Sequence, residues 1–128
     1  MKVLVVDDTS VMRRILKTFL GELKITDITE AVNGKEGLAT AMQQDFELIF
    51  SDWNMPEMNG FQFLQAVKAI ERYKTVPVIM VTTEAEKQRI VDAIAAGAAG
   101  YILKPYDGPT LHRKIRSILA NTSVKLAV

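Results

Sequence analysis

Polar or charged side chains stand directly after four of the five short apolar runs in this chain. In chain order they are Asp7 with Asp8, Asp52, Thr82 with Thr83, and Lys104. If the runs are parallel strands of one sheet, these residues share its carboxyl edge, where ligands bind near the reversal of strand order. Each of them alone is an ordinary start of a loop, but together they predict one site.

Three carboxylates in one site would repel one another. Two like charges 4 Å apart cost about 4 kcal/mol at an effective dielectric constant of about 20. A protonated carboxyl group or a bound cation would relieve this repulsion. Because the nearby ligands are all oxygen atoms, we expect a hard cation, and Mg²⁺ suits a site that keeps several waters. The sequence therefore predicts one Mg²⁺ at Asp7, Asp8 and Asp52.

An amine and a hydroxyl group beside a metal-bound carboxylate would suit phosphoryl transfer. Lys104, Thr82 and a divalent ion around Asp52 would balance the charge on three phosphoryl oxygens. Positioning and charge stabilisation supply most of the rate of such reactions. The alternative is that Lys104 forms only a structural ion pair with Asp52.

Composition excludes several other classes of protein. The 128 residues suit one domain, and 48 % of them are hydrophobic, enough for a buried core. A net charge of +1 argues against a nucleic-acid binder. With no Cys and one His, His112, a thiolate nucleophile, a disulfide framework and a Cys/His zinc site are excluded. No run approaches the roughly 18 apolar residues of a membrane span, and Asp7 ends the first run too early for a signal peptide, so we expect a cytoplasmic protein without membrane insertion.

Apolar runs alternate with amphipathic stretches five times. The runs are residues 3–6, 27–31, 48–51, 78–81 and 100–103. The residues at helical spacing between and after them are Met12, Ile15, Leu16, Phe19, Leu20 and Leu23; Leu38, Ala41 and Met42; Phe61, Leu64, Val67 and Ile70; Ile90, Val91 and Ile94; and Leu111, Ile115, Ile118 and Leu119. This alternation predicts an α/β fold with a parallel sheet covered by helices on both faces. Asn33 is predicted to cap a helix and Gly97 to end one.

Several separated motifs resemble the signature of the receiver domains of two-component response regulators. They are Val5-Val6-Asp7-Asp8, Ser51-Asp52-Trp53-Asn54-Met55-Pro56, Val81-Thr82-Thr83 and Gly100-Tyr101-Ile102-Leu103-Lys104-Pro105. The resemblance covers residues 2 to about 120. It implies a single doubly wound, flavodoxin-like (βα)5 domain with strand order 2-1-3-4-5. This family is one of the known examples of that fold. We expect residues 1–121 to form this domain and residues 122–128 to be a short tail, with no output domain.

The resemblance also assigns roles at the strand ends. Asp52 would accept a phosphoryl group from a phosphohistidine of a sensor kinase, and Lys104 would contact that group. Asp8 and Asp52 would bind Mg²⁺ directly with the backbone carbonyl of Asn54, whereas Asp7 would act mostly through water. The protein would catalyse its own phosphorylation and dephosphorylation, without turnover of an external substrate.

Further residues of the family pattern would act in the conformational switch and in the lifetime of the phosphorylated state. Thr82 and Tyr101 would move after phosphorylation, and Asn54 and Glu84 would tune the rate of dephosphorylation. Lys104-Pro105 would be a cis peptide. We expect Trp53 to be a half-exposed neighbour of the acceptor.

Chemotaxis regulators within this family provide the nearest resemblance, which implies a partner surface. It would comprise Ala85, Lys87, Ile90, Tyr101, Leu103, Tyr106 and Lys114. The implied partner is the flagellar motor switch, and a phosphatase is a further candidate partner. One alternative is a relay intermediate or phosphate sink without motor binding, and another is an interaction module that is never phosphorylated. A hydrolase or a flavin carrier on the same fold is disfavoured, since the chain contains no GxxxxGK[ST] loop.

Overall fold

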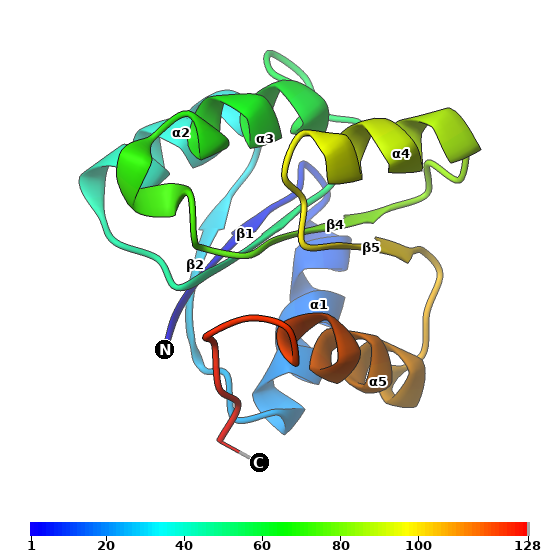
Figure 1. Ribbon diagram of the computed structural model, residues 1–128. Coiled ribbons are helices and arrows are strands. Elements are labelled where there is room, and N and C mark those ends of the chain that lie inside the picture. The colour runs from blue at the N-terminus through cyan, green and yellow to red at the C-terminus, as the bar shows by residue number, and fades with distance from the viewer. Residues whose placement is uncertain (128) are drawn as a thin grey trace.

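A five-stranded parallel sheet lies between two layers of helices in the computed structural model, which describes residues 1–127 (Figure 1). The strands are β1 (Lys2–Val6), β2 (Asp27–Ala31), β3 (Leu48–Ser51), β4 (Val78–Thr82) and β5 (Gly100–Leu103). The helices are α1 (Ser10–Glu22), α2 (Gly34–Gln43), α3 (Gly60–Lys68), α4 (Lys87–Ala95) and α5 (Gly108–Leu119), with a 3-10 turn, Glu71–Tyr73, after α3. The strand order β2-β1-β3-β4-β5 confirms the predicted doubly wound topology.

Successive residues of the central strands face opposite layers. In β1, Leu4 and Val6 belong to one buried cluster, and Val3 and Val5 belong to the other. Met80 of β4 is fully buried. Because both faces of the sheet are covered, the central strands read in the sequence as continuous apolar runs rather than as alternating ones.

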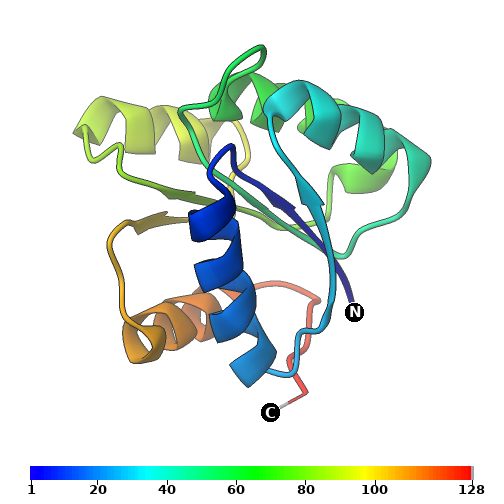
Figure 2. The same cartoon turned by 180° about the vertical axis from the view of Figure 1, so that it is seen from behind.

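The two layers contain different helices. Helices α2, α3 and α4 cover one face of the sheet, and α1 and α5 cover the other (Figures 1 and 2). The first layer contributes Phe63 and Leu64 of α3 and Ala93 of α4 to its cluster, whereas the second contributes Leu20 of α1 and Ile115 of α5. The sheet is therefore packed on both faces below the loops at its carboxyl edge.

Two predicted helix boundaries are confirmed. The Asn33 side chain accepts a hydrogen bond from the Glu36 N–H (2.8 Å) at the start of α2. Gly97 follows α4 with φ of +108°, a left-handed conformation that favours glycine, and its N–H donates to the Ile94 carbonyl (3.0 Å).

The hydrogen-bonded ladder continues past the strand ends. The Asp7 N–H donates to the Ala31 carbonyl (3.1 Å), and the Asp52 N–H donates to the Val6 carbonyl (2.9 Å). Lys104 donates in the same way to the last residue of β4 (2.9 Å). The residues that follow β1, β3 and β5 are therefore held in line with the sheet at one edge.

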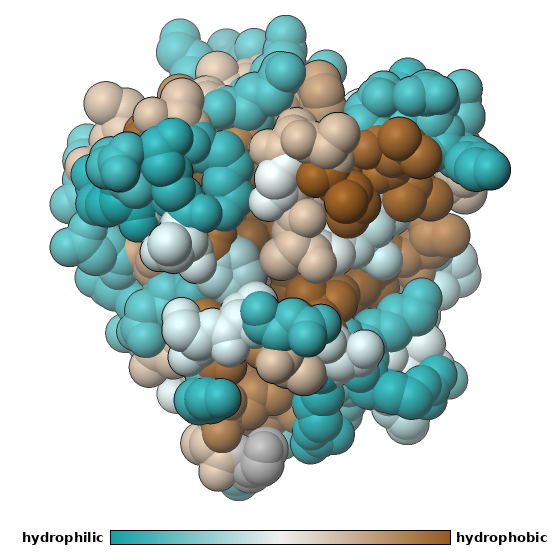
Figure 3. All heavy atoms as spheres, in the orientation of Figure 1, coloured by the Kyte–Doolittle hydropathy of each residue, from teal (hydrophilic) through white to brown (hydrophobic). Residues whose placement is uncertain are grey.

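Helix α4 buries less apolar surface than its sequence predicts. Val91 and Ile94 are both 49 % exposed, and Ala93 is the buried residue of this helix. Figure 3 shows the apolar surface that gathers over α4. The helix packs on edge strand β5, so fewer of its side chains reach a covered face of the sheet.

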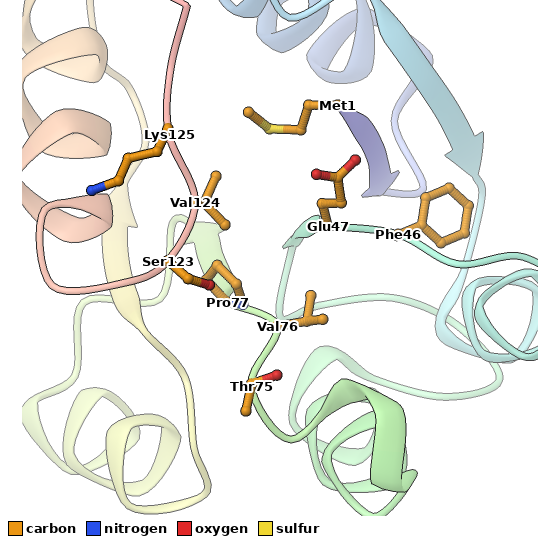
Figure 4. A pocket seen from close by; sticks show the side chains of 9 residues that line it. All are labelled: Met1, Phe46, Glu47, Thr75, Val76, Pro77, Ser123, Val124 and Lys125. Carbon is orange, nitrogen blue, oxygen red and sulfur yellow. The ribbon is translucent and has the colours of Figure 1, made fainter.

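The chain after α5 lies at the opposite edge of the sheet, where the strands begin. Val124 and Leu126 pack against the cluster beneath α1 and α5, whereas Val128 lies outside the described residues. Val124 also lines a cavity of about 500 Å³ with residues that precede β3 and β4. Figure 4 shows the Lys125 amine pointing away from this cavity. The predicted chemistry lies at the other edge of the sheet.

The described helices include none that is long and apolar enough to cross a lipid bilayer.

Candidate functional site

Three carboxylates meet at the carboxyl edge of the sheet. Asp7, Asp8 and Asp52 each offer an oxygen atom, and these atoms lie within 4.8 Å of one another. Asp7 is buried, Asp52 is half-buried and Asp8 is exposed, so the cluster opens to solvent on one side. The convergence of these residues, which was predicted from their positions after β1 and β3, is confirmed.

The Lys104 amine reaches the same cluster from β5. Its Nζ lies 2.8 Å from Asp7 Oδ2 and 3.1 Å from Asp52 Oδ2, and 7 % of its side chain is exposed. Burial by itself lowers the pKa of Lys104, but the hydrogen bond to Asp7 and the charge of Asp52 outweigh it and hold that pKa above its ordinary value. Lys104 is therefore a charged ammonium facing the acids. The Lys104-Pro105 peptide is cis, as predicted.

The composition of the cluster suits a divalent cation. Its donor atoms are carboxylate oxygens, and three carboxylates against one ammonium leave a net charge of −2 (1 − 3). Asp7 is largely occupied by protein donors, because its Oδ1 also accepts the Thr9 N–H (2.9 Å). Asp8 is exposed and Asp52 is half-buried, so the cluster can be reached from solvent. A hard, oxygen-seeking ion such as Mg²⁺ fits this donor set.

The Asp52 carboxylate is oriented by its own loop. Its Oδ1 accepts the Trp53 N–H (2.6 Å), while Oδ2 faces Lys104. The loop then turns into α3, where the Gly60 N–H donates to the Trp53 carbonyl (2.7 Å). The position of Asp52 thus depends on the close approach of α3 to the end of β3.

Thr82 and Tyr101 both contact the backbone of Glu84. The buried Thr82 hydroxyl accepts the Glu84 N–H (3.3 Å), and the Tyr101 hydroxyl donates to the Glu84 carbonyl (2.7 Å). Burial, aided by the charge of Glu84, raises the pKa of Tyr101 to about 12, so this hydroxyl stays neutral. The two residues predicted to switch are therefore connected through one loop.

Asn54 and Glu84 lie in different loops and are paired directly. Asn54 Nδ2 donates to Glu84 Oε1 (3.0 Å), which joins the loop after β3 to the loop after β4. Both residues were predicted to influence the lifetime of a phosphorylated Asp52, but their contact was not predicted.

The prediction that Trp53 is half-exposed is wrong. Its exposed fraction is 5 %, and its ring stacks on Phe61 with 5.3 Å between centroids and 20° between planes. The Arg89 guanidinium lies over the same ring, 5.1 Å from its centroid. The side chain is covered by α3 on one side and α4 on the other.

Two arginines at this edge make contacts that were not predicted. Arg13 donates to the Asp7 carbonyl (2.7 Å) and forms an ion pair with Glu30 of β2 (2.9 Å). Arg89 forms an ion pair with Glu84 (3.6 Å). An arginine on an amphipathic helix reads as a solvated charge, so the sequence carried no signal for either contact.

The residues proposed as a partner surface divide into two groups. Six of them lie on α4 and its preceding loop, β5 and α5: Ala85, Lys87, Ile90, Tyr101, Leu103 and Lys114. Tyr106 instead packs edge-on against Phe19 of α1 with 6.1 Å between ring centroids, and its hydroxyl is buried. Burial and the charge of Asp7 raise the pKa of Tyr106 to about 12. The Tyr106 hydroxyl therefore faces the interior rather than a partner.

Comparison with known proteins agrees with this geometry. Residues 3–116 match the response regulator receiver domain family. Chemotaxis protein CheY of Pseudomonas aeruginosa is 45 % identical over 118 residues, which cover 92 % of this chain and 95 % of the relative. A chemotaxis protein CheY homolog of Campylobacter jejuni is 42 % identical over 124 residues, covering 96 % of this chain and 95 % of the relative.

A solved structure of similar shape is that of chemotaxis protein CheY4 of Vibrio cholerae. It has a TM-score of 0.84 and 36 % sequence identity, and the match covers 92 % of this chain and 98 % of that one. The sheet order, the acidic cluster with its lysine and these matches lead to one conclusion: the chain belongs to the receiver domains of two-component response regulators and resembles the CheY proteins among them.

Proposed function

We propose that Asp52 accepts a phosphoryl group from the phosphohistidine of a sensor histidine kinase and that the phosphorylated protein acts in chemotaxis signalling. The observation that carries this proposal is the 3.1 Å contact between Asp52 and Lys104 within a cluster of oxygen ligands. The names of the chemotaxis relatives support the second part.

The transfer exchanges one bond to phosphorus for another. An oxygen atom of the Asp52 carboxylate attacks the phosphorus, the bond from the histidine nitrogen breaks, and the imidazole leaves and is protonated from solvent. Lys104, held as a cation by its two acidic neighbours, faces the charge on the phosphoryl oxygens. The Thr82 hydroxyl, at the end of β4, accepts the Glu84 N–H and would move to donate its own hydrogen to a phosphoryl oxygen.

A bound Mg²⁺ would supply further positive charge at the phosphoryl oxygens. Asp8, Asp52 and the backbone carbonyl of Asn54 would hold it directly. Asp7, which is more deeply buried than Asp8 and Asp52, would act through water.

Return to the ground state is a hydrolysis. A water oxygen attacks the phosphorus, the bond to the Asp52 oxygen breaks, and the products are the Asp52 carboxylate and inorganic phosphate. Asn54 and Glu84, joined across the two neighbouring loops, would set how easily water approaches.

Asp52→Asn is expected to abolish phosphorylation, because an amide oxygen is a poor nucleophile and the product would not be an acyl phosphate. The protein is incubated with Mg²⁺ and acetyl phosphate, and its intact mass is measured. The unsubstituted protein should gain one phosphoryl group. The exposed Asp27→Asn serves as a matched control and should gain it as well. Labelling of Asp52→Asn at the same peptide would overturn the assignment, and no labelling of any form would favour an interaction module that is not phosphorylated.

The proposed output surface consists of α4, β5 and α5. Arg113, Lys114 and Arg116 give α5 a basic stretch, which suits an acidic segment of a flagellar motor switch protein. Movement of Tyr101 away from the Glu84 carbonyl would couple this surface to Asp52.

Phosphorylation is therefore expected to tighten binding of an acidic motor-switch peptide about tenfold, and Lys114→Glu to weaken it in both states. Fluorescence anisotropy of a labelled peptide measures both effects. Exposed Lys35→Glu on α2, which covers the other face of the sheet from α5, is a charge-matched control. Equal, negligible binding in both states would favour the alternative role as a relay intermediate or phosphate sink.

A further inference from the structure

Arg89 of α4 contacts the loops on both sides of the acidic site. Its Nε lies 3.6 Å from Glu84 Oε2 and 3.7 Å from Glu86 Oε2, and its guanidinium stands over the Trp53 ring. The Arg89 side chain is 40 % exposed, but its planar head is held between a carboxylate and an aromatic face. Stacking of a planar cation on a ring suits arginine better than lysine.

The contacts with Trp53 and Glu84 each lead to Asp52 in one further step. Trp53 is the next residue in the chain, and its N–H orients the Asp52 carboxylate. Glu84 bonds the Asn54 side chain, which lies two residues beyond Asp52. Arg89 thus clamps the loop after β3 to the loop after β4, and these strands are neighbours in the sheet.

We infer that Arg89 is a positioning residue that holds the Glu84–Asn54 bridge closed beside Asp52 and thereby slows hydrolysis of the aspartyl phosphate. This inference rests on the proposed phosphorylation of Asp52. Without the guanidinium, Glu84 keeps a single side-chain partner, Asn54, among the described residues. The bridge then opens more often, and water reaches the phosphorus more readily.

The contact with Glu84 carries most of this effect. It fixes the carboxylate from the side opposite Asn54, so that both oxygens of Glu84 are engaged. The contact with Trp53 sets the orientation of the guanidinium and keeps it over the loop. Removing Arg89 should therefore change the hydrolysis rate only while Glu84 retains its charge.

Arg89→Ala is expected to accelerate loss of the phosphoryl group about threefold to fivefold, the effect of one partly exposed ion pair on a rate. The protein is labelled with acetyl phosphate, the donor is removed, and the decay of the labelled mass is followed. The decay rate of Arg89→Lys should lie between those of the unsubstituted protein and Arg89→Ala, because lysine keeps the charge without the planar stacking. Exposed Arg14→Ala on α1 is the matched control and should decay at the unsubstituted rate.

A double-mutant cycle tests whether Arg89 acts through Glu84. In a Glu84→Gln background, Arg89→Ala should change the decay rate by less than about 1.5-fold, because the charge on which Arg89 acts has been removed. An effect as large as in the unsubstituted background would overturn the action through Glu84.

A second readout needs no phosphorylation. Arg89→Ala uncovers one face of Trp53, so quenching of its emission by neutral acrylamide should increase, whereas Arg14→Ala should leave it unchanged. Unchanged quenching together with an unchanged decay rate would overturn the inference about Arg89 and leave the proposed function intact. If the unsubstituted protein were never labelled, the proposed function would fail with it, and the quenching result would then report only the packing of Arg89.

Discussion

Lys104→Met is expected to lower the free energy of unfolding of the metal-free protein by about 3 kcal/mol. Methionine has nearly the length of the lysine stem, so packing changes little, but the ammonium between Asp7 and Asp52 is lost. The two carboxylates have side chains that are only 8 % and 12 % exposed, and they would face each other without a compensating charge. Urea denaturation in the presence of a chelator measures the difference.

Asp52→Asn provides the control for this prediction. It removes one charge of the cluster and leaves the 2.8 Å pair of Lys104 with Asp7 in place, so its stability should change by less than about 1 kcal/mol. Millimolar Mg²⁺ should restore part of the stability of Lys104→Met, because an ion that binds only the folded state stabilises it. Equal stability of Lys104→Met and the unsubstituted protein would show that the ammonium contributes nothing to the fold.

The same lysine also predicts a dependence on pH. The pKa of Lys104 in the folded protein lies above its ordinary value of 10.5, so folding favours the protonated amine. Its contribution is fully present below pH 10.5 and is lost as the pH rises through the higher folded pKa. Burial raises the pKa of Tyr101 and of Tyr106 to about 12, so ionisation of these two hydroxyls at high pH also destabilises the fold. This loss is the same in both proteins and does not affect the difference between them. The unsubstituted protein should therefore keep its advantage over Lys104→Met up to pH 10.5 and lose it as the pH rises further.

The acidic cluster could be predicted because it depends on topology. In a parallel sheet every strand delivers its next residue to the same edge, so Asp8, Asp52 and Lys104 must approach one another once the apolar runs are identified as strands. The exact packing of the side chains is not needed for this conclusion. Local signals such as the Asn33 cap were equally readable, because their partners lie within one helical turn.

The contacts between layers could not be predicted in the same way. Trp53 is buried because Phe61 and Arg89 cover it, and both arrive through the tertiary fold. Val91 and Ile94 follow the helical spacing of a buried face, yet they are exposed because α4 lies over an edge strand. Periodicity identifies an apolar stripe, but the area available beneath a helix decides how much of that stripe is covered.

Gly60→Ala is expected to destabilise the protein by about 3 kcal/mol and to slow phosphorylation of Asp52 on the order of 100-fold. A Cβ atom at Gly60 would lie 1.9 Å from the Asp52 carbonyl oxygen and 2.8 Å from Trp53 Cα. These atoms belong to the backbone, so no side-chain rotation can relieve the overlap. The start of α3 must move away from the end of β3, and Asp52 must shift relative to Lys104.

Gly21→Ala is the matched control, because a Cβ atom there has no heavy atom within 4 Å. Gly21 lies within α1, where alanine favours the helix, so this variant should be as stable as the unsubstituted protein or more stable by up to about 1 kcal/mol. Thermal denaturation and the rate of labelling by acetyl phosphate distinguish two ways in which Gly60→Ala can act. A loss of stability with a normal labelling rate would mean that the displaced α3 leaves Asp52 in place. A reduced rate with near-normal stability would mean that the shift is taken up by the acceptor loop itself, which makes the close approach at Gly60 a requirement of the chemistry rather than of the fold.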